Sequence, residues 1–392
     1  MPAANDHHSV LVSPVIPGDR GFGMRMRAGL LYRALGLLGP VRVVVAPVFG
    51  PVDAEPGDVV GGDHLTVLDI DPAADPRIDF TRRLAEPSQR DRAATLHPRP
   101  ALCRTATLEV VASVAGLVAG AARVLVMREY LAPLLDGVLD GADRPFCVLD
   151  VDDIESSARR QFGDPTEADR YEALEHHYFP LFDLVLACSD DDADELRDRY
   201  DITPVVVPNA VDVPTAMEPV PPRWDLLFVA NLSYPPNVHA ARWLCEEVLP
   251  RLDGATVALV GANPAPEVVT LGASDHALVT GTVPGVSPYY AASRIVCVPL
   301  HTGGGTSIKV LEAFAHRRPV VSTTTGGRGL PVRHGEHLLL ADDADSFARA
   351  CRGLLASPEQ AGRLAAAGFN LVRERFTPQH VSALLADALS RQ

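Results

Sequence analysis

The chain alternates short runs of apolar and β-branched residues with longer stretches in which apolar positions recur at helical spacing. Short apolar runs predict buried strands, and helical segments between them predict crossovers that make the sheets parallel. The pattern occurs twice, once on each side of residues 212–224, which hold four prolines and no periodicity. Such a segment is typical of a linker. The sequence therefore predicts an α/β protein with two Rossmann-like halves that face each other across a ligand cleft.

The predicted elements can be placed by residue number. In the first half we expect strands at 9–14, 41–47, 123–127, 146–153, 184–189 and 203–209, and helices at 24–38 and 106–122. In the second half we expect strands at 225–231, 255–261, 277–281, 294–300 and 319–323, and helices at 239–252, 306–316 and throughout 358–390. Residues 51–100 are rich in Pro, Asp and Arg, and their order is left open.

These elements predict four segments along the chain. They are an N-terminal Rossmann-like domain at 1–205, a proline-rich linker at 206–224, a C-terminal Rossmann-like domain at 225–375 and a C-terminal helix at 376–392. The helix is expected to cross back to the first domain.

Charge is divided unevenly between the halves of this 392-residue chain, whose net charge is −15. Residues 1–200 hold 20 arginines against 33 acidic residues, a balance of −13, and residues 201–392 balance at −2. An acidic protein without a basic stripe does not suit nucleic acids or anionic membranes. The second half would therefore repel an anionic ligand less than the first half.

The longest uncharged apolar run, 110–122, has 13 residues. A membrane-spanning helix needs about 18. The N-terminus also lacks the basic and apolar regions of a secretory signal. We therefore expect no membrane span and a cytoplasmic protein.

Two residue types are informative by their number. The six cysteines lie far apart without a CxxC pair, which favours buried thiols in a reducing compartment over disulfides or zinc. The chain has 34 arginines but a single lysine, Lys309, and this lysine follows three glycines in HTGGGTSIKVLEAF.

This segment follows a predicted buried strand and opens a predicted helix. Glycines let a ligand approach the backbone, and free amides at a helix N-terminus attract anions. Lys309 and Glu312 lie three residues apart, on one helix face. The pattern suits a nucleoside diphosphate, with Lys309 at the phosphates and Glu312 at the ribose hydroxyls. It also suits a structural glycine-rich turn with a surface Lys–Glu pair. It is neither a P-loop nor GxGxxG.

The segment PLHTGGGTSIKVLEAFAHRRPVVSTTTGGRGL (299–330) resembles the donor-binding signature of family 4 (group 1) glycosyltransferases of the GT-B fold. VPNAVD (207–212), FVANLSYPPNVHAARWL (228–244) and VTGTVPGVSPYYAASRIVCVPL (279–300) resemble further motifs of the family in the same order. PGDRGFGMRMRAGLLYRAL (17–35) is similar to the family's first loop.

The resemblance implies a metal-independent, retaining, hexosyl-type transferase that needs no cofactor. A nucleotide sugar would bind the second half, and a small-molecule or glycan acceptor the first. The donor-binding residues it implies are Gly303, Gly304, Gly305, Thr306, Ser307, Lys309, Glu312, Asn231, Gly281 and Val283. On the acceptor side it implies Gly21, Arg25, Asp152, Asp153 and Glu155. Lys309, Glu312 and Asp152 are the expected catalytic residues.

The chain departs from the family pattern at several positions. The first glutamate of the family's pair falls on Gly304, a family arginine on Ser307, and a family arginine and lysine on Asn231 and Asn237. Lys309 is left as the main cation for the diphosphate, with Arg328, Arg20 and Arg25 as possible helpers.

Acidic motifs admit more than one interpretation. We interpret the two DxD strings, Asp69–Asp71 and Asp150–Asp152, as chance matches and expect no metal. The acidic run after Ser189 is expected to be a helix start that Ser189 caps. The acidic first half is either a solvated surface or a lining that favours a cationic acceptor such as an amino sugar.

Two other functions share the predicted fold. One is a non-catalytic nucleotide-sugar-binding protein, which the departures at Gly304, Asn231 and Ser307 suggest. The other is a nucleotide-sugar epimerase or a phosphorylase. A pyridoxal phosphorylase needs a Schiff-base lysine, for which the chain offers only Lys309.

Overall fold

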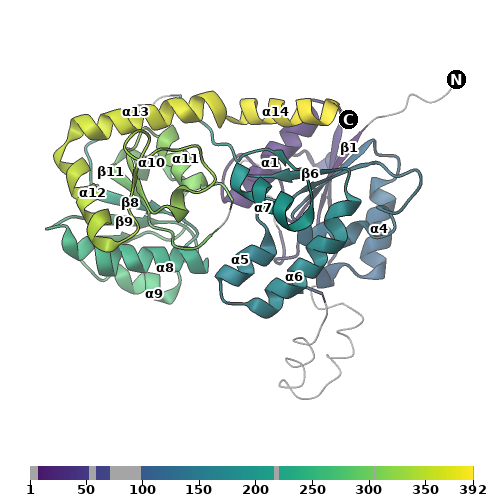
Figure 1. Ribbon diagram of the computed structural model, residues 1–392, viewed down its shortest axis with the longest axis horizontal. Helices are drawn as coiled ribbons and strands as arrows, with labels where there is room; N and C mark the ends of the chain where they lie inside the picture. Colours follow the sequence, from purple (N-terminus) through teal and green to yellow (C-terminus); the bar gives the residue numbers. More distant parts are fainter. Residues whose placement is uncertain (1–7, 53–58, 71–98, 216–219, 304, 392) are drawn as a thin grey trace, which may run out of the picture. The chain divides into compact units, whose positions relative to one another are not determined.

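The computed structural model of the chain describes residues 8–52, 59–70, 99–215, 220–303 and 305–391. Its internal contacts define two units. The first comprises Met1–Pro208 and Ser382–Gln392, and the second comprises Asn209–Val381. Each unit is built on one sheet with helices packed along it (Figure 1).

The first unit contains a seven-stranded sheet of order β3-β2-β1-β4-β5-β6-β7, in which every pairing is parallel. Its strands are β1 (Ser9–Ser13), β2 (Val41–Val45), β3 (Leu65–Val67), β4 (Arg123–Met127), β5 (Phe146–Asp150), β6 (Leu184–Ala187) and β7 (Val205–Val206). The helices are α1 (Gly23–Gly36), α4 (Leu108–Val118), α5 (Glu155–Gln161), α6 (Pro165–Tyr178) and α7 (Asp190–Tyr200).

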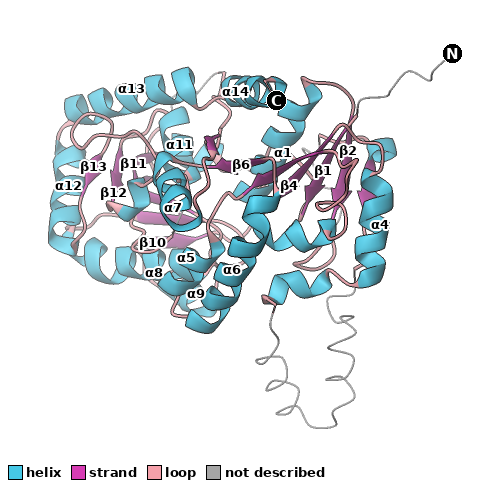
Figure 2. Cartoon of the chain, turned by 45° about the vertical axis from the view of Figure 1, so that its right-hand side comes forward, coloured by secondary structure: helices cyan, strands magenta, loops and turns pink. Residues whose placement is uncertain are grey.

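The second unit contains a six-stranded sheet of order β10-β9-β8-β11-β12-β13, again parallel throughout. Its strands are β8 (Trp224–Val229), β9 (Val257–Val260), β10 (Ala277–Val279), β11 (Ser293–Val298), β12 (Val320–Ser322) and β13 (Leu339–Leu340). Its helices are α8 (Pro235–Trp243), α9 (Pro266–Leu271), α10 (Ser287–Ala291), α11 (Ile308–Ala315), α12 (Ala344–Ala356) and α13 (Pro358–Arg375). Figure 2 shows strands flanked by helices in both units.

The alternation of strands and helices that the sequence predicts is confirmed in both units. The edge strands β3 and β13 were not predicted, and β3 lies in the segment 51–100 whose order was left open. Residues 358–390 are helical as predicted, except for a short break between two helices. Helix α13 ends at Arg375, and α14 (Pro378–Ser390) begins at a proline. Proline has no amide hydrogen to continue the helical ladder, so the chain breaks there.

Both cores consist of the apolar runs that defined the strands. Val10, Val12, Val126 and Leu149 are fully buried in the first unit, and Leu226, Phe228, Val257 and Ile295 are buried in the second. The cysteines are free, and all but the half-buried Cys245 are buried, as the sequence predicts. Within the described ranges no helix is long and apolar enough to cross a membrane.

Two glycines hold the first loop of the chain against α1. A Cβ atom at Gly29 would lie 2.3 Å from the carbonyl oxygen of Gly18, which is far inside contact distance. The loop that follows β1 therefore packs directly on the helix backbone. This contact fixes residues 18–22 at the end of β1, where the candidate site of the first unit begins.

We expect Gly29→Ala to lower the free energy of unfolding by about 1–3 kcal/mol, because the added methyl must push the loop away from α1. Gly36→Ala in the same helix is the matched control, since a Cβ there meets nothing within 4 Å. It should raise stability by about 0.5–1 kcal/mol through helix propensity. Urea unfolding of both variants measures the difference, and equal effects would show that the Gly18 contact is unimportant.

Candidate active site

Each sheet reverses its strand order at one position, and the loops at that position are natural ligand sites. The reversal lies between β1 and β4 in the first unit and between β8 and β11 in the second. Helices on the two sides of a reversal leave in opposite directions, which opens a crevice beyond the carboxyl ends of the strands. The predicted site residues follow these strands or their close neighbours.

In the second unit, the glycine loop joins β11 to α11. Gly303 has φ of 138° and Gly305 has φ of 65°, conformations that side-chain-bearing residues rarely adopt. Gly304 lies outside the described residues. Thr306 is buried. Ser307 occupies the position before α11, and its side chain caps no amide. Its buried Oγ has no hydrogen-bond partner among the described residues.

Lys309 and Glu312 lie in the first turns of α11, and Glu312 is held from behind. The hydroxyl of Tyr290, a fully buried residue of α10, donates to Glu312 Oε2 at 3.1 Å. Burial raises the pKa of Glu312, while the Tyr290 hydrogen bond and the charge of Lys309 oppose that rise. The described hydrogen bonds of Glu312 use only one of its carboxylate oxygens, so the other is available to a ligand.

His316 ties α10 to α11 behind this carboxylate. Its ring stacks on Tyr290 with centroids 4.4 Å apart. One ring nitrogen lies 2.7 Å from the carbonyl oxygen of Glu312 and the other lies 3.0 Å from Ser287 Oγ. The position of Glu312 is therefore fixed by a packed aromatic pair.

The turn after β12 supports the glycine loop from the side. Thr323 Oγ1 donates to the carbonyl of Leu300, where β11 leads into the loop, and accepts from the amide of Gly326 at 3.0 Å. A Cβ at Gly326 would lie 2.4 Å from the carbonyl oxygen of Val298, so only glycine fits there. These contacts fix the start of the loop.

Asn231 and Asn237 bind the turn between β8 and α8. Asn237 Nδ2 donates to the Asn231 carbonyl at 2.8 Å, and Asn231 Oδ1 accepts from the amide and the hydroxyl of Ser233. Asn237 is 4% exposed, and its Oδ1 has no partner within the described part of the chain. The ring of His301 packs against Trp243 of α8 with centroids 4.8 Å apart, which brings the β11 loop beside this helix.

Gly281 and Val283 lie further along the same edge. They follow β10, the outermost strand on that side of the sheet. Gly281 has φ of 70°, and its carbonyl accepts from Thr280 Oγ1 at 2.8 Å. The predicted donor residues thus span the carboxyl edge from β10 to α11.

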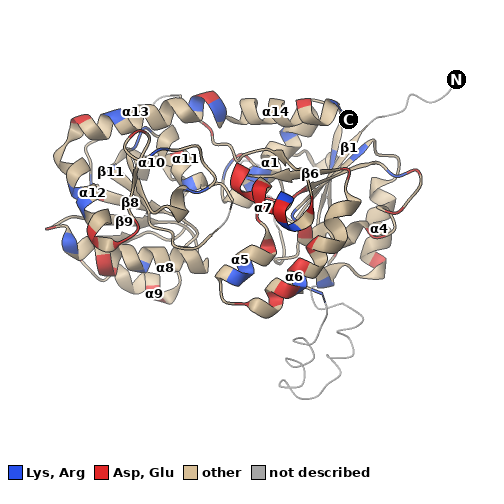
Figure 3. Cartoon of the chain, in the orientation of Figure 1, with Lys and Arg blue, Asp and Glu red and all other residues tan. Residues whose placement is uncertain are grey.

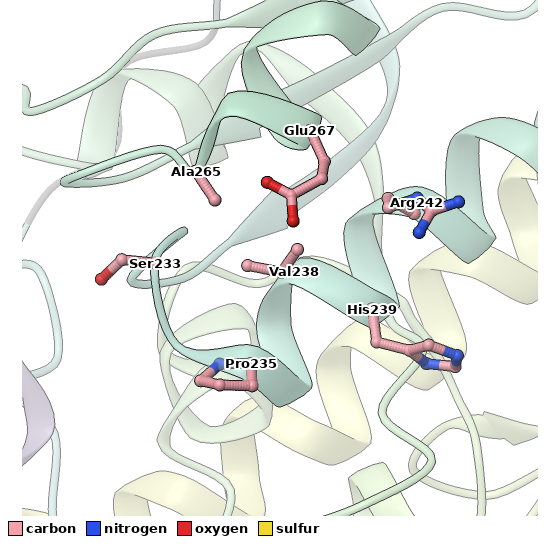
Figure 4. A pocket seen from close by; sticks show the side chains of 7 residues that line it. All are labelled: Ser233, Pro235, Val238, His239, Arg242, Ala265 and Glu267. Atoms are coloured by element: carbon pink, nitrogen blue, oxygen red, sulfur yellow. The ribbon is translucent and has the colours of Figure 1, made fainter. Parts of the chain in front are cut away.

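A separate cavity of about 250 Å³ lies between α8 and α9. Figure 4 shows Glu267 of α9 and Val238 of α8 pointing toward one another there. None of the predicted donor residues lines this cavity. It is therefore distinct from the candidate donor site.

In the first unit, Arg25 packs against its own loop. It is 4% exposed, its Nη1 donates to the Arg20 carbonyl at 3.0 Å, and its guanidinium covers the face of Gly18. Gly21 has φ of 109°, a conformation that favours glycine at this position. Both predicted acceptor-side residues therefore shape the loop that follows β1.

Asp150 and Asp152, the ends of one DxD string, each bond a different arginine. Arg27 of α1 bonds both carboxylate oxygens of Asp150, and its Nη1 donates to the carbonyls of Val207 and Pro208. Asp152 accepts from Arg128 Nη1 at 3.0 Å. Asp71, in the other string, lies outside the described residues. Among the described residues no group of His, Cys, Asp and Glu has the arrangement of a metal site.

Arg128 is the functional candidate that the sequence analysis missed. It directly follows β4, is 8% exposed, and contacts Asp152 and Asp153 through Nη1 and Glu155 through Nη2. A charged residue directly after a buried strand was the available signal. The sequence could not show that the three acids predicted for the acceptor side surround it.

The backbone at this cluster is strained. Arg128 has φ of 74° and Asp152 has φ of 60°. The amide of Asp153 donates to the carbonyl of Val151 at 2.7 Å, which closes a rare three-residue turn. Such conformations cost about 1–3 kcal/mol each and are concentrated at functional sites.

Asp153 is the least firmly held of the three acids. Its Oδ2 reaches Arg128 only at 3.4 Å, and about 30% of its side chain is exposed. Its Oδ1 has no hydrogen-bond partner among the residues described. Burial raises the pKa of Asp153 to about 6, although the charge of Arg128 opposes the rise.

A second pair of acids lies behind this cluster. Glu129 is fully buried, and its Oε1 accepts from the amide of Glu155 at 2.9 Å. Burial, together with the adjacent Glu175, raises the pKa of Glu129 well above its usual value. Glu175 accepts from the amide of Ser156 at 2.9 Å, so both acids hold the start of α5.

Residues 223–357 match the family described as Glycosyl transferases group 1. Over this segment the chain is similar to group 1 glycosyltransferases. The segment contains the complete second sheet, the glycine loop and both Lys309 and Glu312. The resemblance of the donor segment to group 1 glycosyltransferases is thereby confirmed.

Two curated proteins are similar to part of the chain. The GDP-mannose-dependent α-(1-6)-phosphatidylinositol monomannoside mannosyltransferase of Mycobacterium tuberculosis is 30% identical over 154 residues, 36% of this chain and 40% of that protein. An uncharacterized 44.6 kDa protein in the cps region of Klebsiella pneumoniae is 24% identical over 176 residues, 40% of this chain and 44% of that protein. The matches thus span less than half of each relative.

Solved structures resemble the chain over nearly its whole length. Sucrose-phosphate synthase from Thermosynechococcus elongatus has a TM-score of 0.71 at 17% identity and covers 98% of both chains. Anabaena HepE, in complex with UDP and glucose, has a TM-score of 0.68 at 15% identity and covers 98% of this chain and 99% of its own. At such identities the likeness shows the fold alone. The predicted GT-B fold is confirmed.

The raised pKa of Asp153 predicts a stability effect that depends on pH. In the unfolded chain the carboxyl group of Asp153 ionises at lower pH than in the folded protein. Its ionisation therefore destabilises the fold increasingly as the pH rises to about 6, and the destabilisation is complete above that pH. Asp153→Asn should therefore raise the melting temperature at about pH 8 and leave it nearly unchanged at about pH 4.

Asp183→Asn is the matched control for this measurement. Asp183 has a similar exposure of 27% but bonds Arg144 through both oxygens, at 2.6 and 2.7 Å. Its loss should lower the melting temperature at about pH 8. An Asp153→Asn variant that melts earlier than the parent at that pH would contradict the assignment.

Proposed function

We propose that the chain is a family 4 glycosyltransferase that moves a hexosyl group from a nucleoside-diphosphate sugar to an acceptor hydroxyl, with retention and without a metal. The observation that carries the proposal is the start of α11 in the segment that is similar to group 1 glycosyltransferases. Two glycines with positive φ, Gly303 and Gly305, precede a helix that presents Lys309 and Glu312 on one face. A cation and a carboxylate so placed suit the two ends of a nucleoside diphosphate.

The donor diphosphate would be bound by the amides of the glycine loop and by Lys309, since free amides at a helix N-terminus attract anions. The unpartnered hydroxyl of Ser307 can donate to the same phosphates. The second oxygen of Glu312 would accept from the ribose hydroxyls. The base is open, because HepE binds UDP whereas the mycobacterial relative is named for GDP-mannose.

In the retaining mechanism that the family resemblance implies, no protein nucleophile is needed. The sugar–phosphate bond breaks while the acceptor oxygen bonds the sugar on the same face, and a donor phosphate oxygen takes the acceptor proton. Lys309 would stabilise the charge that grows on the leaving diphosphate. Asp152 bonds Arg128 and Cys188 through its two oxygens, so we propose a structural role for it in place of a catalytic one.

The acceptor would bind the first unit at the carboxyl ends of β1, β4 and β5, where the strand order reverses. A small molecule or a glycan fits this proposal. A cytoplasmic location and a cationic acceptor remain predictions from the sequence.

Lys309→Ala should weaken the binding of UDP or GDP about ten- to a hundred-fold, because a charge-assisted contact to phosphate contributes about 1.5–3 kcal/mol. Titration calorimetry measures the affinity. Arg349→Ala on the exposed face of α12 removes a cation from the same unit and should leave affinity unchanged. Unchanged affinity in Lys309→Ala would refute the phosphate role.

Glu312→Gln should fold normally, because glutamine can still accept from Tyr290, but should bind nucleotide about ten-fold more weakly through loss of the charged acceptor. Tyr290→Phe is the matched control: it removes the internal hydrogen bond, lowers the melting temperature and leaves the carboxylate for the ribose. A Glu312→Gln variant that unfolds would instead show that Glu312 is structural.

A non-catalytic nucleotide-sugar-binding protein is the alternative that one observation favours. Asn231 and Asn237, which stand where the family has cations, are bonded into their own turn. Tight nucleotide-sugar binding without donor hydrolysis or sugar transfer, over a broad acceptor panel, would support this alternative.

A further inference from the structure

Two phenylalanine rings are exposed at the carboxyl edge of the first sheet. Phe22 is 49% exposed and Phe49 is 56% exposed, and no other phenylalanine among the described residues is exposed. Phe22 follows β1 and directly precedes α1, and Phe49 follows β2. A ring left in water forgoes the stabilisation that burial would give. Exposed apolar rings at a sheet edge that is also a candidate site point to a ligand that covers them.

A tight turn presents Phe49 to solvent. The amide of Gly50 donates to the carbonyl of Pro47 at 3.1 Å and so closes a turn around Val48 and Phe49. Val48 is buried in the core of the unit, whereas Phe49 is exposed. Gly50 has φ of 118°, a conformation that favours glycine. The turn therefore fixes Phe49 on the outer side of the loop.

Tyr130 connects Phe49 to the loop after β1. Its ring meets the ring of Phe49 nearly at right angles, with centroids 5.8 Å apart. Its hydroxyl lies 3.8 Å from the sulfur of Met24, which is in the first turn of α1 and two positions after Phe22. Tyr130 itself is only 1% exposed, so it supports the exposed rings from below. We call Phe22, Met24, Phe49 and Tyr130 the aromatic edge.

The aromatic edge adjoins the position where the strand order reverses. Its residues follow β2, β1 and β4, which are neighbours in the first sheet, and the reversal lies between β1 and β4. The guanidinium group of Arg128 lies 5.7 Å from the centre of the Tyr130 ring, so the aromatic edge continues into the cluster of Arg128 and its acids. Small-molecule sites typically combine apolar and aromatic walls with a few polar groups. The first unit has both at one edge.

Charge decides between a membrane and a small molecule as the occupant of this surface. An anionic bilayer attracts basic segments. Residues 1–200 instead hold 20 arginines against 33 acidic residues, and Asp152, Asp153 and Glu155 lie beside Arg128. A small aromatic molecule needs no such attraction, because ring pairs attract one another beyond the area that they bury.

We propose that Phe49 and Phe22 bind an aromatic ring of the acceptor, so that the acceptor is a small molecule whose reacting hydroxyl lies close to such a ring. This inference rests on the proposed glycosyltransferase function. In the transfer the acceptor O–H bond and the sugar–phosphate bond break, the acceptor oxygen bonds the sugar carbon, and the proton leaves with the nucleoside diphosphate. The ring takes no part in bond making and serves to hold the hydroxyl at the carboxyl edge.

The experiment uses matched acceptors that differ in the ring: phenyl β-glucoside against methyl β-glucoside, and 2-phenylethanol against 2-cyclohexylethanol. The full chain is supplied with UDP-glucose and GDP-mannose, and product is measured by mass spectrometry. We expect the KM of the phenyl glucoside to be at least about ten-fold lower than that of the methyl glucoside. The aromatic alcohol should have a KM about two- to ten-fold lower than its cyclohexyl analogue, because only the aromatic ring gains the ring-pair attraction.

Three variants test the role of the ring. Phe49→Ala should raise the KM for phenyl β-glucoside about ten-fold and so remove the preference over the methyl glucoside. Phe49→Tyr keeps the ring and should keep the preference. Leu37→Ala is the matched control, because Leu37 is 62% exposed but lies at the other end of α1, where the chain turns toward β2. It should change neither KM, and melting temperatures report whether each variant is folded.

Binding is also measured without turnover, by saturation-transfer NMR of phenyl β-glucoside with and without UDP. The phenyl ring should show contact with the parent chain and lose it in Phe49→Ala. Equal KM values within the glucoside pair, or a preference that survives in Phe49→Ala, would overturn the proposal. Binding to phosphatidylcholine or phosphatidylglycerol vesicles that Phe49→Ala abolishes would also overturn it, since the surface would then dock on a membrane.

Failure of the proposed function is recognised separately. A chain that binds neither UDP nor GDP in calorimetry lacks the donor site, and both proposals then fall. A chain that binds nucleotide but no aromatic ring keeps the proposed function and refutes this inference alone.

Discussion

Every strand in each sheet runs parallel to its neighbours, and this constraint places all carboxyl ends on one edge. A parallel pair needs a crossover, so the helices leave from that edge and the loops between strand and helix gather there. Where the strand order reverses, between β1 and β4 and between β8 and β11, the helices diverge. The strained turns at Asp152 and Gly305 lie at this edge because it is where backbone can depart from regular structure.

Buried ion pairs fix the edge of the first sheet. Arg27 joins α1 to the end of β5 through Asp150, and it also bonds the carbonyls of residues 207 and 208, where the chain leaves this unit. Removing one partner would leave an uncompensated buried charge, which is far more costly than losing an exposed pair. The pair therefore sets where helix, strand and exit segment meet. Arg128 fixes the neighbouring turns in the same way.

The acidic charge of the first half has two distinct locations. Figure 3 shows acidic residues gathered along α6 and α7, and several of them are exposed. The acids at the start of α7 directly follow the Ser189 cap. The acids in the first turn of α7 interact favourably with the positive end of the helix dipole. The other exposed acids favour solubility. The acids at the sheet edge are instead bonded to arginines, so a large net charge on the half does not become an equally large charge at the site.

The sequence by itself determined the α/β pattern, the strands with long apolar runs, the Ser189 helix cap and the group 1 donor segment. These features depend on residues close together in the chain, so composition and spacing reveal them. Only the tertiary structure decided that Arg128 lies among Asp152, Asp153 and Glu155 and that Tyr290 holds Glu312. Both contacts join elements that are apart in the sequence. The edge strands β3 and β13 form because a neighbouring strand offers hydrogen bonds, and that contact is not visible in the local sequence.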